Sequence, residues 1–566
     1  MKTDRVLKIS LLMFMVLFFF FHLFPLIYLF DVDFTSSFLY DRWNLSSTRN
    51  DGALLRHRVL ADPKKQRSLG ATLLSLAVDR KTDETVGILF PGWEVFVVAD
   101  PLFAGPGEGL HCVFPNNATS PARFAGVLPS SDRETFICTL PRSARRHPYY
   151  QPMLTMCFRS PYPVVPHRQP PELLRWNYLA YDSLSTEDDV VLFVKGVNRW
   201  RRISLPPSEL NCVFYDGDDP AVGVRTAVTS SVQEVFRCGH PLLAKGGNGQ
   251  EEHVNIKITL EIPLEKRFVP SVAYYAPYRA SPPRASKSLT CASTMVYNVA
   301  KFIREWVIYH SRIGVEQFIL YDNGSDDDLA SAVMKLTREG YDVSTIFWPW
   351  PKSQEAGFSH SAVLHNTSCT WMIYTDVDEF LYAPPWDGHN HPSPLLIESS
   401  ILPRPPRAED IGQVSIKCYE FGPSGQRSHP HGGVIDGYTC RNRMEQRHKS
   451  LVRLDAVDWS LQNWIHHFSL RQGFREERLG LERAVVNHYK FQAWPEFKIK
   501  FRRRASAYVA DWTQQVNPSS KDRTTGLGYK AVEPEDWADR YCEVADERLK
   551  RLTQRWFGTG YRMPWD

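Results

Sequence analysis

The chain has 566 residues, and 67 Lys and Arg against 63 Asp and Glu give it a formal net charge of +4. At about 150 residues per domain, this length predicts about three or four structural units, and 43% hydrophobic residues are enough for packed cores. The near balance of charge argues against a dedicated nucleic-acid-binding protein, which would carry a marked basic excess. Ten cysteines in a chain of this length exclude a small disulfide-scaffold protein.

The N-terminus has the pattern of a membrane anchor. Residues 11–30 form an uncharged, mostly apolar run, whose length matches a hydrocarbon layer of about 30 Å when it is helical. A cleaved signal peptide usually has a shorter apolar core of about 7 to 15 residues. Basic residues precede the run, and Asp31 and Asp33 follow it. The positive-inside rule therefore predicts a cytosolic tail over residues 1–10 and a type II protein with a lumenal body, which begins with a stem over residues 31–84.

Short apolar runs separated by Pro and Gly follow over residues 85–270, a spacing typical of β-strands. Two of these runs recur one hundred residues apart, where Cys112 and Cys138 correspond to Cys212 and Cys238. The repeat predicts a duplicated antiparallel β unit with one disulfide in each copy, formed in an oxidising lumen; a chance similarity of strand sequences is the alternative. Such an all-β, sandwich-like region either binds carbohydrate or acts as a spacer.

The periodicity changes after a linker rich in Pro, Arg and Ser, residues 271–288. Residues 289–566 then begin with alternating strand-like and helical runs, such as the strand-like EQFILYD and WMIYT. This alternation predicts an α/β, Rossmann-like domain with a mostly parallel sheet. Ligands of such sheets bind at the carboxyl ends of the strands. The sequence contains neither the Gly-rich dinucleotide-binding motif nor a P-loop.

Acidic residues follow two of these strands. Asp376 and Asp378 come directly after WMIYT, and in an extended chain residues two apart face the same side, so both carboxylates would face one ion. Carboxylate oxygens are ligands of Mg²⁺ and Mn²⁺, and these ions commonly hold diphosphates. Asp322 and Asn323 follow EQFILYD. Asp322 is a candidate to bind the ribose or base of a nucleotide, and an Asx turn before the next helix is the alternative.

Four runs of the C-terminal region resemble plant members of glycosyltransferase family 92: VYNVAKFIREWVIYHSRIGVEQFILYDNGSDD, IYTDVDEFLY, FGPSGQRSHPHGGVI and VVNHYKFQAWPEFKIKF. The resemblance spans about residues 288–515. It implies a GT-A-like fold and an inverting, metal-dependent sugar transfer in the Golgi. The best-known plant relatives are galactan synthases that use UDP-galactose, so the expected donor is a UDP-sugar and the expected acceptor is a cell-wall polysaccharide or another glycan. Plant relatives also carry an N-terminal β-domain that resembles a carbohydrate-binding module.

The resemblance also assigns roles to individual residues. Asp376 and Asp378 match the family's metal-binding pair, and His488 matches a later histidine that completes the shell around Mn²⁺ or Mg²⁺. The residues expected to bind the donor are Asn298, Asp322, Asn323, Asp376, Asp378, Lys498 and Lys500. The two lysines belong to a basic run that could neutralise the departing diphosphate, and a solvated basic face is the alternative.

An inverting transfer needs a base that takes the proton of the acceptor hydroxyl. Glu420, before the Gly-rich loop, is the first candidate, followed by Asp436 and Glu379; strand alternation turns Glu379 away from the metal and makes it the weaker base. Cys418 and Cys440 bracket the same loop and are candidates for a third disulfide.

Two other functions compete with sugar transfer. A glycoside hydrolase also uses paired carboxylates, but it needs no metal. A catalytically idle, membrane-anchored protein that binds glycans is the main alternative. The sequence leaves association into a homo-oligomer open, and no nucleic-acid partner is expected.

Overall fold

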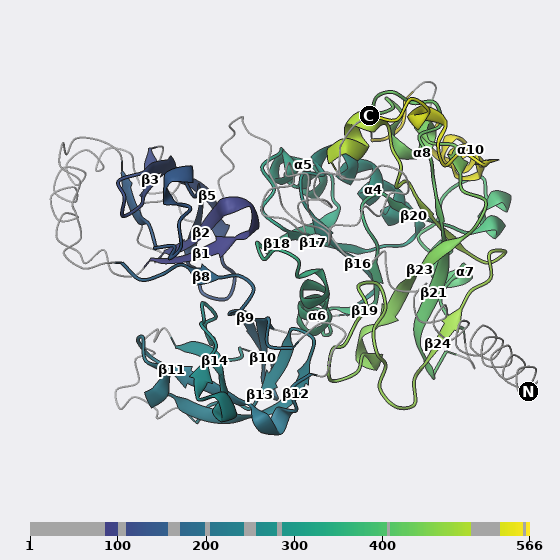
Figure 1. Cartoon of the computed structure of the whole chain (residues 1–566). Helices are drawn as coiled ribbons and strands as arrows, with labels where there is room; N and C mark the ends of the chain where they lie inside the picture. Colours follow the sequence, from purple (N-terminus) through teal and green to yellow (C-terminus); the bar gives the residue numbers. More distant parts are fainter. Residues whose placement is uncertain are drawn as a thin grey trace, which may run out of the picture.

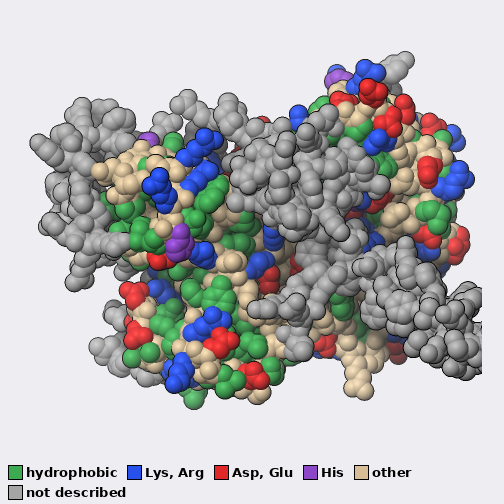
Figure 2. Space-filling view, in the orientation of Figure 1, with side chains coloured by type: hydrophobic (Ala, Val, Ile, Leu, Met, Phe, Trp, Pro, Cys, Tyr) green, Lys and Arg blue, Asp and Glu red, His purple; other side chains and the backbone are tan. Residues whose placement is uncertain are grey.

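The computed structural model describes residues 85–99, 109–156, 170–198, 204–242, 256–279, 286–404, 408–499, 533–558 and 562–565. The expected cytosolic tail, membrane span and stem lie outside these ranges. Within them, no helix is long and apolar enough to cross a membrane. Figure 1 shows two β-rich units beside a larger α/β domain. On the visible face of the β-rich units, basic, acidic and apolar side chains are intermixed, in keeping with the small net charge (Figure 2).

The first β-rich unit contains two sheets, with strand orders β5-β6-β2-β1-β8 and β4-β3-β7. Its strands are β1 (Val86–Phe90), β2 (Glu94–Ala99), β3 (Leu110–Val113), β4 (Thr119–Pro121), β5 (Arg123–Val127), β6 (Glu134–Thr139), β7 (Met153–Met156) and β8 (Leu174–Arg175). A disulfide between Cys112 of β3 and Cys138 of β6 joins the two sheets. The cystine is fully buried among the apolar side chains of both sheets, so it closes the core of the unit.

The second β-rich unit is a seven-stranded sheet of order β15-β14-β11-β12-β13-β10-β9. Its strands are β9 (Leu179–Ser185), β10 (Val190–Lys195), β11 (Asn211–Tyr215), β12 (Val224–Val232), β13 (Val235–Cys238), β14 (Lys257–Ile262) and β15 (Arg267–Phe268). Cys212 and Cys238 form the second predicted disulfide. The antiparallel pair β10·β13 corresponds to β2·β6 in the first unit, because Cys238 faces Val190 as Cys138 faces Val95.

The second unit extends into the segment predicted as a linker, residues 271–288. The backbone of Ser271 bridges Ala180, and that of Tyr274 bridges Lys257. The first strand of the α/β domain then begins at Ser288. The segment therefore links the two parts, as its composition predicts, and its first residues are bonded to strands of the second unit.

The α/β domain is built on a nine-stranded sheet of order β18-β17-β16-β19-β23-β21-β25-β20, with β24 beside β21. Its strands are β16 (Ser288–Val296), β17 (Gln317–Asp322), β18 (Asp342–Phe347), β19 (Cys369–Tyr374), β20 (Glu379–Tyr382), β21 (Ile411–Glu420), β23 (Gln446–Arg453), β24 (Arg475–Arg478) and β25 (Val485–His488). The first four strands in this order are parallel, as the sequence predicts. The sheet as a whole is mixed, because β23 runs antiparallel to both of its neighbours.

Both faces of this sheet are covered. The helices of the domain are α4 (Ala300–Ile313), α5 (Leu329–Arg338), α6 (Gln354–Leu364), α7 (Leu396–Ser400), α8 (Gly433–Gly437) and α10 (Arg548–Phe557). Helix α4 buries an apolar face that includes Ile303, Trp306 and Val307, and it ends at Gly314, whose φ of 126° is accessible to glycine. A Cβ atom there would lie 2.4 Å from the carbonyl oxygen of Pro394. Glycine at this position therefore allows the close approach of two chain segments.

The β-rich units share a hydrophobic core with the α/β domain. Trp176 and Tyr181 pack against Trp350, with ring centroids 5.7 and 5.2 Å away, and α6 lies on the same side of the large sheet (Figure 1). The indole of Trp350 also donates a hydrogen bond of 3.0 Å to Asp182 Oδ2. Lys195 Nζ donates to the backbone oxygen of Lys352 at 2.6 Å. The two parts therefore form one packed body in the described residues.

Asp182 makes this shared core sensitive to pH. Burial raises the pKa of its carboxyl from 3.8 to about 6, although hydrogen bonds from Trp350 and Ser183 favour the charged form. A carboxyl whose pKa is higher in the folded than in the unfolded protein destabilises the folded state as pH rises from about 4 to about 7. Asp182→Asn carries no titrating carboxyl here. Its free energy of unfolding, relative to that of wild type, should therefore be about 2 kcal/mol higher at pH 7 than at pH 4. Urea unfolding at both pH values measures this, and an unchanged difference between the two proteins would contradict it.

The third predicted disulfide is wrong. Cys440 bonds to Cys542, and Cys418 is a buried free thiol. Cys440 lies in the short strand β22 (Cys440–Arg441), which pairs with the C-terminal strand β26 (Val544–Ala545) and so approaches Cys542. Cys418 lies inside β21 with its side chain in the core, where Cys440 does not reach it. A fourth disulfide joins Cys291 of β16 to Cys369 of β19.

Candidate active site

The chain turns sharply after β19, where the acidic motif lies. The backbone N–H of Glu379 donates to the carbonyl oxygen of Asp376 at 3.0 Å, and the N–H of Asp376 donates to Glu379 Oε2 at 3.0 Å. Residues 376–379 therefore form a turn rather than extended chain, and the side chains do not alternate as predicted. Glu379 is fully buried and faces the acidic cluster instead of pointing away from it.

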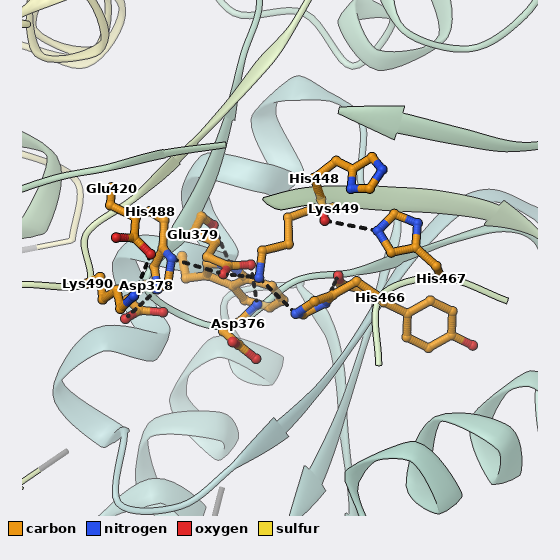
Figure 3. A network of polar contacts seen from close by, with 12 residues as sticks. Asp376, Asp378, Glu379, Glu420, His448, Lys449, His466, His467, His488 and Lys490 are labelled. Carbon is orange, nitrogen blue, oxygen red and sulfur yellow. Dashed lines mark hydrogen bonds and ion pairs between the residues drawn. The ribbon is translucent and has the colours of Figure 1, made fainter. Parts of the chain in front are cut away.

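Asp378, Glu379 and His488 form the first group of ligand atoms, which lie within 4.8 Å of one another. His488 ends β25, directly opposite Glu379 of β20. Its Nε2 lies 3.6 Å from Asp378 Oδ2, and its Nδ1 lies 3.6 Å from Glu379 Oε1 (Figure 3). Burial lowers the pKa of His488 to about 4, against the opposing effect of Asp378. The imidazole is therefore neutral at physiological pH, which is the form that binds metals.

Asp376, Glu379 and His466 form a second group, which already contains a cation from the chain itself. Lys449 Nζ lies 2.5 Å from Glu379 Oε1 and 2.8 Å from His466 Nε2 (Figure 3). His466 is oriented from its other side, because its Nδ1 lies 2.7 Å from the carbonyl oxygen of Tyr374. The ammonium of Lys449 would repel a divalent ion at this position. Of the two groups, the one with Asp378 and His488 is therefore better suited to a metal.

The charges of Glu379 and Lys449 depend on each other. Burial opposes the ammonium form of Lys449, but the carboxylates of Glu379 and Asp376 outweigh it and raise the pKa of the lysine. Burial raises the pKa of Glu379, and Asp376 and Asp378 add to this shift, whereas the ammonium of Lys449, 2.5 Å away, opposes it and favours the carboxylate. Glu379 is buried and depends on Lys449 for its charge, so we assign it a structural role beside the acidic motif. The side chain of Glu379 is inaccessible to solvent, which disfavours it as a base for an acceptor hydroxyl.

The donor atoms of the first group fit a hard divalent cation. The carboxylate of Asp378 and the neutral imidazole of His488, whose Nε2 faces it, are suitable ligands for Mn²⁺, and Mg²⁺ prefers carboxylate oxygens. Of the three predicted metal ligands, the structure brings Asp378 and His488 together and places Asp376 in the neighbouring group with Lys449.

The two remaining candidate bases lie in different surroundings. Glu420 ends β21 beside His488 of β25, and its Oε1 lies 2.5 Å from Lys490 Nζ (Figure 3). Glu420 therefore borders the site and is paired with a cation there. Asp436 lies in α8, where its Oδ1 accepts a hydrogen bond from Gln554 of α10 at 2.7 Å. This contact gives Asp436 a role in packing the C-terminal helix, and the structure does not bring it into the acidic cluster.

Asn298 and Asp322 meet at the carboxyl ends of β16 and β17. Asp322 Oδ1 accepts a hydrogen bond from the N–H of Ser325 and so stabilises the turn before α5, as the alternative for this segment expected, but Asp326 does not cap that helix. Asn298 exchanges hydrogen bonds with Asp326: its Nδ2 donates to Asp326 Oδ1 at 2.5 Å, and its Oδ1 accepts from the N–H of Asp326 at 2.8 Å. Because β16 lies between β17 and β19, this cluster and the acidic turn occupy the same edge of the sheet.

The other predicted donor-binding residues are less well placed. Asn323 is almost fully buried, and its Nδ2 donates to the carbonyl oxygens of Trp348 and Trp350 at 2.7 and 3.2 Å, which makes it a packing residue. Lys498 is half-buried beyond Phe497. Lys500 lies outside the described residues.

Three residues of the site are not predicted from the sequence: Lys449, His466 and Lys490. Lys449 is the first residue of the buried run of β23, which continues from Ser450 to Val452. A lysine in such a position requires a buried partner. His466 and Lys490 lie outside the strands that were predicted, so their approach to the acidic turn depends on the tertiary fold.

Comparison with known proteins identifies the family. The family model for glycosyltransferase family 92 matches residues 286–524. A glycosyltransferase family 92 protein of Oryza sativa subsp. japonica is 40% identical over 411 residues, which cover 69% of this chain and 68% of that protein. This chain belongs to glycosyltransferase family 92. It is therefore a glycosyltransferase, and the resemblance noted in its sequence is confirmed.

More distant similarities accompany this family 92 enzyme. A galactan beta-1,4-galactosyltransferase of Arabidopsis thaliana is 28% identical over 142 residues, which cover 22% of this chain and 27% of that protein. Among solved structures, a mannosyltransferase from Pyrobaculum calidifontis in complex with GDP-Man and Mn²⁺ shares 13% identity at a TM-score of 0.23. That match covers 41% of this chain and 64% of the other.

Proposed function

We propose that this family 92 enzyme is a metal-dependent, inverting glycosyltransferase of GT-A type that transfers a sugar from a UDP-sugar to a glycan. The observation that carries the proposal is the meeting of Asp378 and His488 at the carboxyl edge of the sheet, beside the cations Lys449 and Lys490. Such a combination of carboxylate, neutral imidazole and nearby ammonium groups suits a metal-bound diphosphate. The relative that acts on galactan supports galactose as the first sugar to test.

Each residue of the site has its own role in the proposed sugar transfer. Asp378 and His488 would hold the divalent ion, which supplies positive charge to the diphosphate when bound. Glu420 takes the proton of the acceptor hydroxyl, whose oxygen bonds to the anomeric carbon as the bond to the UDP oxygen breaks. Lys490 holds Glu420 at the edge of the site through an ion pair, and attack from the opposite face of the sugar ring inverts the anomeric configuration. Asn298 and Asp322 shape the neighbouring edge for the nucleoside.

The location proposed for this reaction is the Golgi lumen. Residues 11–30 would anchor the chain as a single-pass type II protein, with the β-rich units and the α/β domain on the lumenal side. The four disulfides of the described residues fit an oxidising compartment. The acceptor would be a cell-wall polysaccharide or another glycan made in that compartment.

The experiment that tests the proposal is a screen for UDP release. The purified lumenal part is incubated with a panel of UDP-sugars and glycan acceptors, with Mn²⁺ or with EDTA. We expect one UDP-sugar to turn over in the presence of Mn²⁺ and to lose turnover with EDTA. Turnover that EDTA leaves unchanged would contradict metal dependence, and binding of glycans without turnover of any UDP-sugar would favour the catalytically idle glycan-binding protein.

A further inference from the structure

Two exposed tryptophans lie on the loop that carries His466. The loop connects the short 3-10 helix η9 (Leu454–Ala456) to β24, and its tryptophans, Trp459 and Trp464, are each 42% exposed. The other large indoles of the domain, such as Trp306 and Trp348, are almost fully buried. Tryptophan is costly to expose, and it is enriched at binding surfaces. The exposure of these two rings therefore makes them candidates to bind a ligand.

The backbone of the loop is held firmly in an unusual conformation. Leu461 and Ile465 have φ values of 58° and 63°, and a β-branched residue such as isoleucine rarely adopts this left-handed region. Asn463, which is fully buried, keeps them there: its Nδ2 donates to the backbone oxygen of Glu355 and to Ser359 Oγ, both at 2.9 Å. Its Oδ1 accepts from the N–H of Ile465. Strain that the surroundings maintain in this way is characteristic of functional sites.

The middle of the loop is part of the candidate active site. The N–H of Trp464 donates to the carbonyl oxygen of His467, and the N–H of His466 donates to that of Trp464, both at 2.7 Å. His466, two residues after Trp464, then contacts Lys449 and the carbonyl oxygen of Tyr374. Trp464 is therefore presented by a tight turn whose next residues reach the acidic cluster.

The same loop is also bonded to the second β-rich unit. Gln233, in the turn between β12 and β13, donates through Nε2 to the carbonyl oxygen of Asn463 at 2.7 Å and accepts from its N–H at 3.2 Å. The guanidinium of Arg237 lies 3.6 Å from the ring centroid of Trp459, and it is paired with Asp189 at 2.8 Å. The loop that carries the two tryptophans thus contacts both the second β-rich unit and the acidic cluster.

We propose that Trp459 and Trp464 form the platform that binds the acceptor, a β-linked oligosaccharide, on its way into the active site. This proposal rests on the proposed function. Sugar rings stack on indole through their apolar C–H faces, and a platform of fixed geometry loses little conformational entropy on binding. Trp464, two residues from His466, is placed for the sugar units near the reacting end, while Trp459 is placed for units that extend toward the β-rich unit. The second β-rich unit would then support the platform from behind, because Arg237 packs on the ring of Trp459 and Gln233 holds the backbone of Asn463.

The test measures the kinetics of Trp464→Ala and Trp459→Ala with β-1,4-galactopentaose as the acceptor and UDP-galactose as the donor. We expect the KM for the pentaose to rise about tenfold in Trp464→Ala, with the KM for UDP-galactose within about twofold of wild type. Trp464→Phe should restore most of the loss, since it keeps an aromatic face. Leu264→Ala is the matched control, because Leu264 is an exposed apolar residue of the second β-rich unit away from the loop.

Calorimetric binding of the pentaose to the Asp378→Ala enzyme separates this proposal from the proposed function. Binding weakened about tenfold by adding Trp464→Ala supports the platform, even if no UDP-sugar is turned over by wild type. Equal binding with and without Trp464, or no binding of the pentaose at all, overturns it. An increase in the KM for UDP-galactose that parallels the increase for the pentaose also overturns it, because it would show that the substitution disturbs the donor site.

Discussion

Replacing Asp378 with alanine is expected to lower kcat for sugar transfer by about 10²–10³-fold. The substitution removes the carboxylate whose Oδ2 lies 3.6 Å from His488 Nε2, and with it the principal oxygen ligand proposed for the metal. Loss of one preorganised electrostatic group that stabilises developing charge typically has an effect of this size. UDP release at saturating donor and acceptor measures it.

The control for this experiment is Asp410→Ala. Asp410 is an exposed aspartate paired with Arg475 at 2.7 Å, on the edge of the sheet away from the cluster. Its removal should leave kcat within about twofold of wild type. An Asp378→Ala enzyme that keeps more than about a tenth of the wild-type kcat would contradict the role assigned to this carboxylate.

Replacing Lys449 with methionine should destabilise the protein by about 3–5 kcal/mol. The substitution leaves Glu379, which is fully buried, without the ammonium 2.5 Å from its Oε1. Breaking a buried ion pair by removing one partner costs this much because the other charge stays desolvated. Chemical unfolding of the purified protein gives the change in unfolding free energy.

A second substitution tests the cause of that loss. Adding Glu379→Gln to Lys449→Met removes the uncompensated charge, so the double variant should recover more than half of the lost stability. The matched control is Lys417→Met, which breaks the pair between Lys417 and Glu445 on the surface and should have a much smaller effect. A double variant as unstable as Lys449→Met alone would show that lost packing, rather than the buried charge, explains the effect.

The parts of the fold that follow local periodicity could be predicted from the sequence. Helix α4 and the strands β16, β17 and β19 were recognised from their apolar spacing, and the disulfides of the β-rich units from a repeat of one hundred residues. The position of the acidic motif at the carboxyl edge of the sheet followed from the same pattern. These features depend on residues that are close in the sequence, or on an exact repeat.

The errors concern side chains whose surroundings come from distant segments. Strand alternation placed Glu379 away from the cluster, but a turn between Asp376 and Glu379 reverses its direction. The disulfide of Cys440 goes to Cys542, because the C-terminal strand β26 folds back onto β22. Lys449 reaches Glu379 because β23 is inserted antiparallel beside β19, an arrangement that the sequence of β23 does not specify.

Binding of Mn²⁺ is the measurement that tests the central claim most directly. Titration of Mn²⁺ into the purified enzyme in the presence of UDP, followed by electron paramagnetic resonance, counts the bound ions. We predict one Mn²⁺ per chain in wild type and about the same in Asp410→Ala, with binding lost in Asp378→Ala and strongly weakened in His488→Ala. Equal Mn²⁺ binding by wild type and Asp378→Ala would contradict the assignment of the metal to Asp378 and His488, and with it the proposed mechanism.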